Sequence, residues 1–522
     1  MNLNMGNKPA DRQFERETGP FPQHFLPVQP EHGCAYQDSR QSLLVMKFGG
    51  TSVGDAACIR KVIEIIRRGS AEGDIVVVVS AMSGVTNQLI ETATRSEAGD
   101  RGRAAKILED LRAQHDTALK ALIHPGPERD RIARKIRELF EQCERWCEST
   151  AVLGQLTPQM RDSISSLGER LSAPLVAAAL AAQGVASEAV DATQLVVTDG
   201  YHGAADPKMD LTRERCEARL RPLLQQGVIP IVTGFIGATE DGVLTTLGRG
   251  GSDYSATILG AVLEADEVTI WTDVDGMLTA DPHLVPGAST IPEISYREAA
   301  ELAYFGAKVL HPKTLYPVMQ KRIPVWIRNT FAPEKAGTKI TPGGHAATVG
   351  AKALTAVSDA ALITLGGPAL SGVPDVVGRA LAAAASVRTD VLMSCHSPSC
   401  NHVCLAVAAA SAQTTVEALR REFARDAKHD GAEHVTVDST VAILTVVGHN
   451  LHLVRGIVGR AVDELSRENV NVIATAHGPM ERNASFVVAR KDIKTALVTT
   501  HREFQLCVLN LPQESRSEAQ GL

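Results

Sequence analysis

The segment from Lys47 to Val53, with the sequence KFGGTSV, combines a lysine with two adjacent glycines. Gly49 and Gly50 allow backbone N–H groups to approach an anion closely, and the lysine adds a positive charge beside them. This segment could bind a phosphate group, although a plain glycine turn explains the same residues. The usual nucleotide-binding signatures, GxxxxGK[ST] and GxGxxG after a strand, do not occur in the chain.

A second glycine-rich segment, Thr245 to Asp253, places Arg249, Ser252 and Asp253 among three glycines. A guanidinium group can hold a carboxylate through two hydrogen bonds, and an aspartate can bind an ammonium group or a hydrated metal ion. The alternative is that Ser252 or Asp253 only caps the next helix. That alternative leaves the arginine between the glycines unexplained.

Two further segments carry charge at expected element ends. Trp271 to Gly276 (WTDVDG) ends a strand with clustered carboxylates, and Phe305 to Pro312 (FGAKVLHP) supplies Lys308 and His311. Taken separately, either segment could be ordinary solvated surface. His311 is expected to be a packed or capping histidine rather than a catalyst.

The elements around these segments alternate between strands and helices. Leu43 to Phe48 predicts a buried strand, and Asp55 to Arg68 predicts a helix with one apolar face; a second strand is expected at Ile75 to Ser80, with a helix opening near Gln88. Repetition of this unit predicts a parallel sheet covered by helices on both faces. Ligands of such sheets bind at the carboxyl ends of the strands.

Residues 100–160 interrupt this alternation. They are highly charged and helical in period, and Pro125-Gly126-Pro127 predicts the turn of a helical hairpin. We interpret the segment as an insertion. Alternation resumes at Val228 to Thr233, and the turn-rich stretch Ala332 to Gly344 is expected to hold the domain boundary.

After Val349 a strand, helix, strand, strand order occurs twice, starting near Ala361 and again near Val441. Two such units predict a ferredoxin-like pair, a shape that suits the binding of small amino acids. Structural pairing without a ligand is the alternative.

Composition excludes several classes of function. A net charge of -7 with interspersed signs and an aromatic content of 4% argue against nucleic acid as a partner. The apolar runs are too short to span a membrane, so no membrane partner is expected. Nine scattered cysteines favour a reducing, cytoplasmic compartment; Cys395, Cys400 and Cys404 match no zinc spacing and are expected to be buried or half-buried thiols.

Six segments, taken in order, resemble the signature segments of aspartate kinases: Lys47 to Val53, Ser80 to Asn87, Ser166 to Arg170, Gly248 to Asp253, Trp271 to Gly276 and Gly306 to Pro312. The resemblance covers about Leu43 to Phe504. It implies an α/β amino-acid kinase fold, with a mainly parallel sheet sandwiched by helices, followed by two ferredoxin-like ACT modules. We therefore expect a disordered extension over residues 1–41, a catalytic domain over 42–335 with a helical insertion at about 100–160, ACT modules over 345–435 and 436–510, and a disordered tail over 511–522.

The resemblance also implies an activity, the transfer of the γ-phosphoryl group of ATP to the side-chain carboxylate of L-aspartate, with Mg²⁺ bound to the nucleotide. It assigns catalysis to Lys47, Asp253 and Lys308. The implied ATP-binding residues are Lys47, Gly49, Gly50, Thr272, Asp273, Asp281 and Lys308. The implied aspartate-binding residues are Ser80, Thr86, Glu169, Arg249, Ser252 and Asp253.

Regulation is implied as well, with lysine or threonine as a feedback effector and a homodimer or homotetramer formed through the ACT modules. The expected effector-binding residues are Leu370, Ser371, Val373, Pro374 and Asp375. Leu278 and His283 replace a tyrosine and an arginine that the family commonly carries, which predicts weaker ATP binding. From the short polar stretch after Phe504, we expect no fused homoserine dehydrogenase.

Two other hypotheses remain open at this point. One is an amino-acid kinase with another acceptor, such as glutamate or acetylglutamate. The other is a catalytically silent ACT-type sensor, which the presence of Lys47, Arg249, Asp253 and Lys308 argues against.

Overall fold

The computed structural model describes residues 42–306, 310–344, 349–366, 373–397, 402–424, 435–477 and 482–508. The terminal segments that we expected to be disordered, 1–41 and 511–522, lie outside these ranges, as does Lys308.

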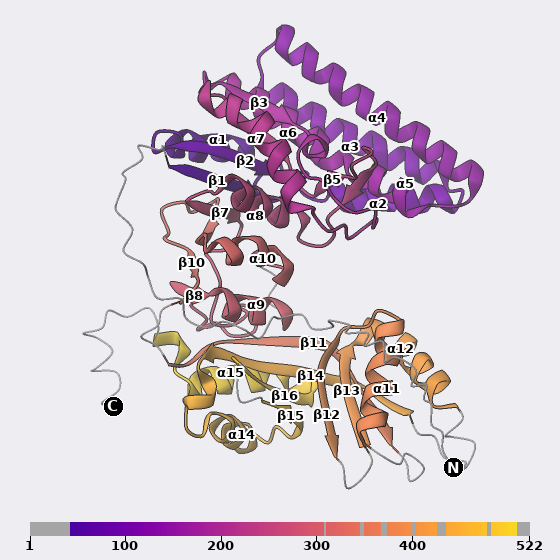
Figure 1. Cartoon of the computed structure of the whole chain (residues 1–522), viewed down its shortest axis with the longest axis vertical. Coiled ribbons are helices and arrows are strands. Elements are labelled where there is room, and N and C mark those ends of the chain that lie inside the picture. Colours follow the sequence, from indigo (N-terminus) through magenta and orange to yellow (C-terminus); the bar gives the residue numbers. More distant parts are fainter. Residues whose placement is uncertain are drawn as a thin grey trace, which may run out of the picture. The chain divides into compact units, whose positions relative to one another are not determined.

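The first sheet has eight strands in the order β3-β4-β2-β1-β7-β9-β10-β8 (Figure 1). All of its pairings are parallel except β9 with β10. The mainly parallel sheet expected from the sequence is therefore confirmed. Its strands are β1 (Leu43–Phe48), β2 (Asp74–Val79), β3 (Ser187–Val190), β4 (Ile229–Thr233), β7 (Glu267–Thr272), β8 (Glu293–Ser295), β9 (Val325–Asn329) and β10 (Thr338–Thr341).

Strand β1 shows why this sheet needs helices on both faces. Its side chains alternate, so that Met46 and Phe48 join one apolar core while Leu43 and Val45 join another. A strand that is apolar on both sides must be covered on both sides.

The helices divide between these two cores (Figure 1). The first core is covered by α1 (Ala56–Gly69), α2 (Val85–Glu97), α3 (Arg101–Leu122), α4 (Pro127–Leu153), α5 (Pro158–Ser165) and α6 (Leu167–Ala181). The second is covered by α7 (Met209–Gln225), α8 (Gly251–Leu263), α9 (Tyr296–Tyr304) and α10 (Pro312–Lys321). A short antiparallel pair, β5 (Ile236–Ala238) and β6 (Leu244–Thr246), lies outside the main sheet.

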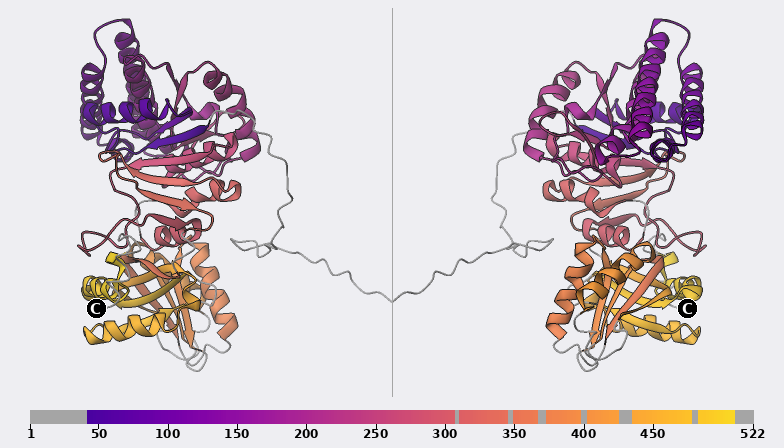
Figure 2. Two further views of the ribbon diagram at one scale, coloured as in Figure 1. Left: turned by 90° about the vertical axis from the view of Figure 1, so that its left-hand side faces the viewer. Right: turned by 90° about the vertical axis from the view of Figure 1, so that its right-hand side faces the viewer.

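The charged segment after residue 100 forms two long helices, α3 and α4, which pack against each other (Figure 2). Pro127 stands in the first turn of α4, where its missing N–H has no helical partner to lose. Leu111, Ile136 and Phe140 fill the space between the helices and join the first core. The hairpin is thus packed onto the catalytic domain.

Strand β10 differs from our expectation. It lies within the stretch Ala332 to Gly344, where we expected only turns between domains. It pairs with β9 and β8, and Ile340 is fully buried in the second core. The first sheet therefore extends beyond residue 335, because pairing with strands distant in sequence overrides the glycines on either side.

The second sheet has six antiparallel strands in the order β12-β13-β11-β14-β16-β15. The strands are β11 (Gly350–Gly366), β12 (Val391–Ser397), β13 (His402–Ala408), β14 (Val435–His449), β15 (Val472–Ala476) and β16 (Asn483–Ala489). Its helices are α11 (Val373–Ser386), α12 (Ala409–Glu422), α14 (Ile457–Arg467) and α15 (Ile493–Glu503). Short 3₁₀ helices occur at η1 (Ala192–Gln194), η2 (Leu451–Leu453), η3 (Arg490–Asp492) and η4 (Leu506–Val508).

The long strands β11 and β14 join the two repeated units. Leu354, in the first half of β11, packs into the core beside α14 and α15, whereas Ile363, in its second half, packs beside α11 and α12. Val435 of β14 belongs to the core of the first unit. The two units therefore share these strands in one continuous sheet.

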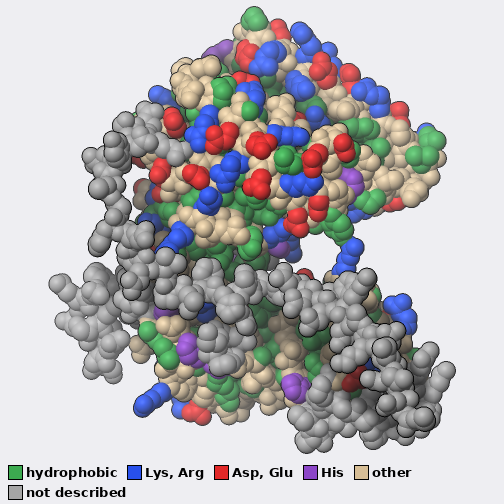
Figure 3. Space-filling model, viewed as in Figure 1, with side chains coloured by type: hydrophobic (Ala, Val, Ile, Leu, Met, Phe, Trp, Pro, Cys, Tyr) green, Lys and Arg blue, Asp and Glu red, His purple; other side chains and the backbone are tan. Residues whose placement is uncertain are grey.

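On the face shown in Figure 3, basic and acidic side chains are interspersed over the part of the chain that holds the first sheet and its helices. Within the described ranges, no helix has both the length and the apolar character that crossing a bilayer requires.

The cysteines in the described ranges are free thiols. Cys395 and Cys404 face each other across β12 and β13 and are half-buried, as expected, while Cys400 lies outside these ranges. No group of three or more metal-binding side chains occurs among the residues with described positions.

Candidate functional site

A cavity of about 490 Å³ opens at the carboxyl ends of four neighbouring parallel strands, β4, β2, β1 and β7. This is the edge at which open α/β sheets bind their ligands. Ten of the residues expected to bind ATP or aspartate line it: Lys47, Gly49, Gly50, Ser80, Thr86, Glu169, Ser252, Asp253, Thr272 and Asp273.

The glycine segment after β1 is tied to both neighbouring strand ends. The N–H of Gly49 donates to the carbonyl of Trp271 at 3.0 Å, and the N–H of Ser80 donates to the carbonyl of Phe48 at 3.1 Å. A Cβ on Gly50 would lie 3.0 Å from the carbonyl oxygen of Ala81. A side chain at this position would therefore press on the neighbouring loop, which explains the glycine.

Lys47 and Asp253 form an ion pair on the cavity wall. The Lys47 Nζ lies 2.5 Å from the Asp253 Oδ1, and their side chains are 10% and 13% exposed. Asp253 lies in the first turn of α8, which begins at Gly251. The pair thus combines a lysine at a strand end with the positive end of a helix dipole, an arrangement suited to a phosphate group.

Glu169 supplies a buried carboxylate to the same cavity from the first turn of α6. The N–H of Ala81 donates to its Oε1 at 3.1 Å, and its Oε2 has no hydrogen-bond partner among the residues that the structure describes. Burial raises the pKa of Glu169 to about 8, against the opposing effects of the Ala81 hydrogen bond and the charge of Lys47. An unpaired, buried acceptor of this kind fits a ligand with an ammonium group.

The start of α2 forms another part of the lining. Gly84 adopts a left-handed conformation (φ +79°) just before the helix, and Met82, Ser83 and Asn87 line the cavity beside it. The helix begins at Val85, earlier than the sequence indicated, because its first turn consists of small and polar residues that are typical of a loop. The first turn of α2 therefore contributes Thr86 and Asn87 to the cavity lining.

Two predicted residues, Arg249 and Asp281, do not line the cavity, and Lys308 lies outside the described residues. Arg249 is exposed, in the loop before α8. The Asp281 carboxylate accepts from the N–H of His283 at 2.9 Å. Asp281 belongs to a segment that packs against the second ACT module through Ala280 and Val285, which accounts for its place away from the cavity.

Leu278 and His283, which stand where the family commonly carries a tyrosine and an arginine, lie in the same segment as Asp281. Leu278 pairs with Thr290 in an isolated bridge, and His283 is exposed. Neither lines the cavity. The predicted weakening of ATP binding stays a prediction.

His311 is a capping histidine, as expected. Its Nδ1 accepts from the N–H of Lys313 at 3.3 Å at the start of α10. Burial, together with the positive charges of Arg249 and Lys313, lowers its pKa. A Cβ on Gly250 would lie 2.9 Å from the Cβ of His311, so the capping residue supports the glycine segment from behind.

Sequence reasoning missed Phe235, which lines the cavity after β4. Its backbone is left-handed (φ 70°), and its N–H donates to the hydroxyl of Ser255 at 2.9 Å. Its ring lies against Gly251, where a Cβ would come within 2.6 Å of Phe235 Cδ2. The only signal in the sequence was its place directly after a buried strand, the same signal that identified the other loops.

The expected effector residues are only partly described. Leu370 and Ser371 lie outside the described ranges, and Val373 and Pro374 open α11. Asp375 is exposed, and its carboxylate lies 3.4 Å from the Arg379 guanidinium. Effector binding at these residues stays a prediction.

Comparison with known proteins agrees with this geometry. The family model "Amino acid kinase family" matches residues 42–329, and an "ACT domain" model matches residues 444–504. The chloroplastic bifunctional aspartokinase/homoserine dehydrogenase 1 of Arabidopsis thaliana is 32% identical over 471 residues, which cover 89% of this chain and 51% of that protein. The chain thus spans about half the length of that relative.

Aspartokinase III of Escherichia coli matches both in sequence and as a solved structure. The lysine-sensitive aspartokinase 3 is 37% identical over 298 residues, which cover 57% of this chain and 64% of that protein. The crystal structure of E. coli aspartokinase III in complex with aspartate and ADP is 29% identical, with a TM-score of 0.75, and covers 89% of this chain and 100% of that one. Because the kinase model covers more than half of the chain, the protein belongs to the amino acid kinase family.

Proposed function

We propose that the protein is an aspartate kinase, which transfers the γ-phosphoryl group of ATP to the side-chain carboxylate of L-aspartate and forms ADP and 4-phospho-L-aspartate. The reaction would be the first step toward the aspartate-derived amino acids lysine, threonine and methionine. The observation that carries the proposal is a single cavity that holds both the Lys47–Asp253 ion pair at a helix N-terminus and the buried carboxylate of Glu169, whose Oε2 has no hydrogen-bond partner among the described residues. The similarity to aspartokinase III, solved with aspartate and ADP, supports it.

The chemistry needs no general base. A side-chain carboxylate is ionised at neutral pH, so the barrier lies in bringing two anions together and stabilising charge on the transferred group. Lys47 offers a fixed positive charge at the cavity wall, where the low exposure of its side chain strengthens its field. Lys308 is proposed as a second positive group by resemblance.

The acceptor would be held at its two charged α-groups. Glu169 would receive the α-ammonium group through its unpaired Oε2, and Arg249 would turn from solvent to bind the α-carboxylate. Recognition of both groups would select an amino acid over a simple dicarboxylate, because the dicarboxylate leaves Glu169 unpaired.

The residues present fit a magnesium ion carried by the nucleotide. Mg²⁺ commonly binds through one or two carboxylates plus substrate phosphates, without a full cage of protein ligands. Asp253 and Asp273 offer such carboxylates at the cavity. When bound, the ion would neutralise charge on the phosphate oxygens.

The test is ADP release with different acceptors at fixed Mg²⁺ and ATP. We expect aspartate to support turnover, and glutamate and acetylglutamate to support little or none. Equal or greater turnover with either of the other acceptors would show that the protein is a different amino-acid kinase.

The raised pKa of Glu169 predicts how aspartate binding depends on pH. With a pKa of about 8 the carboxyl is largely protonated at pH 6 to 7, and only its ionised form can pair with an ammonium group. The apparent affinity for aspartate should therefore rise up to about tenfold per pH unit below pH 8 and level off above it. The measurement is the KM for aspartate against pH at saturating ATP.

Glu169→Gln serves as the comparison for this pH series. The variant should bind aspartate more weakly than the wild type at pH 8 and should lose the dependence between pH 6 and 8. A wild-type KM that does not change across this range would contradict the assignment of Glu169 to the ammonium group.

We also propose lysine as the effector of the ACT modules, on the basis of the match to the lysine-sensitive aspartokinase 3. Lysine at millimolar concentration should lower activity and raise the midpoint of thermal unfolding, because it would bind the folded state. If neither lysine nor threonine changes either quantity, the modules are structural. Threonine as effector, assembly into a homodimer or homotetramer and a cytoplasmic location stay predictions from the sequence.

A further inference from the structure

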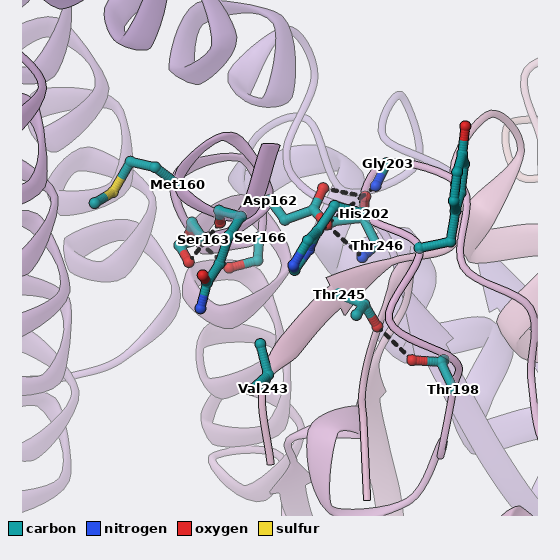
Figure 4. A network of polar contacts seen from close by, with 12 residues as sticks. Met160, Asp162, Ser163, Ser166, Thr198, His202, Gly203, Val243, Thr245 and Thr246 are labelled. Atoms are coloured by element: carbon teal, nitrogen blue, oxygen red, sulfur yellow. Dashed lines mark hydrogen bonds and ion pairs between the residues drawn. The ribbon is translucent and has the colours of Figure 1, made fainter. Parts of the chain in front are cut away.

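Asp162, on α5, is a buried carboxylate outside the cavity lining that receives hydrogen bonds from two distant segments (Figure 4). Its Oδ1 accepts from the hydroxyl of Thr246 at 2.6 Å. Its Oδ2 lies 2.8 Å from the Nδ1 of His202 and accepts from the N–H groups of Gly203 at 3.1 Å and Thr246 at 3.3 Å. Because a carboxylate only accepts, His202 donates from Nδ1. The side chain is 3% exposed, so these bonds replace its hydration.

Both segments support the loop that carries Arg249. Thr246 is the last residue of β6, and the loop to α8 begins at the next residue. The N–H of Ala205 donates to the carbonyl of Thr246 at 2.9 Å, and a Cβ on Gly248 would lie 2.9 Å from the carbonyl oxygen of Gly203. The segment around His202 thus packs directly against the loop.

Among the described residues, no strand of the main sheet pairs with β6, which pairs with β5 in a two-stranded sheet, and an isolated pair of strands is marginally stable. The N–H of Leu247 donates to the carbonyl of Phe235, just after β4, at 2.8 Å, and the hydroxyls of Thr198 and Thr245 add one contact, at 2.7 Å. Asp162 adds a connection from the helices of the first core to the loop.

Asp162 lies on the helix that directly precedes the helix of Glu169, so its hydrogen bonds bear on the geometry of the site. α5 ends at Ser165, and α6 begins at Leu167 and carries Glu169 in its first turn. A Cβ on Gly168 would lie 2.5 Å from the Cβ of Ala81, so this helix start is pressed against the loop after β2. One short helix thus links the Glu169 side of the cavity to the Arg249 side.

We propose that Asp162 is a positioning residue that fixes the loop of Arg249 relative to Glu169, and that it thereby sets the affinity for aspartate without touching either substrate. This inference rests on the proposed function. Among the described residues, no hydrogen bond of the Asp162 network reaches Gly49, Gly50 or Thr272, on the proposed nucleotide side of the cavity. The effect should therefore fall on aspartate and spare ATP.

The test is Asp162→Asn in the full-length protein, a change that keeps the size of the side chain but places an amide NH₂ against donors. Loss of charge-assisted hydrogen bonds should raise the KM for aspartate at least about tenfold and change the KM for ATP less than about twofold. In the absence of substrates, backbone hydrogen exchange should accelerate over residues 200–206 and 245–250 and stay unchanged in β1 and β2.

Three further variants separate positioning from general destabilisation. Thr246→Val removes the hydroxyl that donates to Asp162, and it should raise the KM for aspartate less than Asp162→Asn does. This variant replaces Asp162→Asn as the test if Asp162→Asn does not fold. His202→Asn keeps a donor near the place of Nδ1 and should preserve the aspartate KM. Glu97→Gln makes the same carboxylate-to-amide change at a bond to the N–H of Leu156, away from the loop, and should change neither KM.

The outcomes distinguish this inference from the proposed function. A wild-type protein without aspartate-dependent ADP release would overturn the proposed function and this inference with it. Normal wild-type turnover, together with an unchanged aspartate KM in both Asp162→Asn and Thr246→Val, would overturn the positioning role alone. Equal rises in both KM values, or unchanged hydrogen exchange over the two segments, would also overturn it.

Discussion

Replacing Lys47 with methionine should lower kcat by about 10³-fold or more while the protein remains folded. Methionine keeps most of the length of the side chain but removes the charge 2.5 Å from Asp253. The positive field at the cavity wall is then lost, and the Asp253 carboxylate adds repulsion toward a phosphate group. Initial rates at saturating aspartate and ATP measure the effect.

Lys106→Met is the matched control for this variant. Lys106 is also paired with a carboxylate, Glu109 at 3.0 Å, but it lies on α3 with 57% of its side chain exposed. Its removal should leave kcat unchanged. A Lys47→Met enzyme that retains more than about a tenth of wild-type kcat would refute a direct role of Lys47 in stabilising the transferred group.

Replacing Lys352 with methionine should destabilise the fold by about 3–5 kcal/mol. Lys352 lies near the start of β11 and is 3% exposed, and its Nζ lies 3.0 Å from the Oε1 of the fully buried Glu298. Glu298 also accepts from the N–H and hydroxyl of Ser295, in the capping box of α9. Without the lysine, the buried carboxylate loses its cationic partner, and burial then opposes its ionised form.

Urea-induced unfolding measures this loss. The double variant Lys352→Met/Glu298→Gln should recover much of the lost stability, because it removes the unpaired charge as well. Lys106→Met should change the unfolding free energy by less than about 1 kcal/mol, since exposed ion pairs contribute little. Equal losses of unfolding free energy in Lys352→Met and Lys106→Met would show that the buried Lys352–Glu298 pair stabilises the fold no more than an exposed ion pair does.

Local patterns in the sequence were enough to predict the elements around the glycine segment Lys47 to Val53. The alternation of β1, the apolar face of α1 and the glycines between them are short-range features, and the observed strand matches the expected one residue for residue. The mainly parallel sheet followed from the repetition of that unit. Ten expected site residues meet at one cavity because the ends of parallel strands share one edge of the sheet.

Other features depended on contacts between distant segments and were not visible in the sequence. β10 is short and flanked by glycines, and it forms a strand only because β8 and β9 offer it partners. Phe235 is an apolar residue whose backbone conformation, rather than its type, brings it to the cavity.

Asp162 was missed for a related reason. A carboxylate on a helix next to a charged insertion is indistinguishable from solvated surface in the sequence alone. Its partners His202 and Thr246 lie 40 and 84 residues away, so only the fold reveals the network. Asp281 shows the reverse case, in which a segment assigned to the site by resemblance packs against the second ACT module.

The most direct test of the proposed function is the formation of aspartyl hydroxamate from aspartate, ATP and Mg²⁺ in the presence of hydroxylamine. Hydroxylamine traps an acyl phosphate, so the product reports transfer to a carboxylate rather than hydrolysis of ATP. The proposed function predicts hydroxamate in amounts that match the ADP released by the wild type, and almost none with Lys47→Met. A folded wild-type protein that releases no ADP, or that releases ADP without forming hydroxamate, would contradict it.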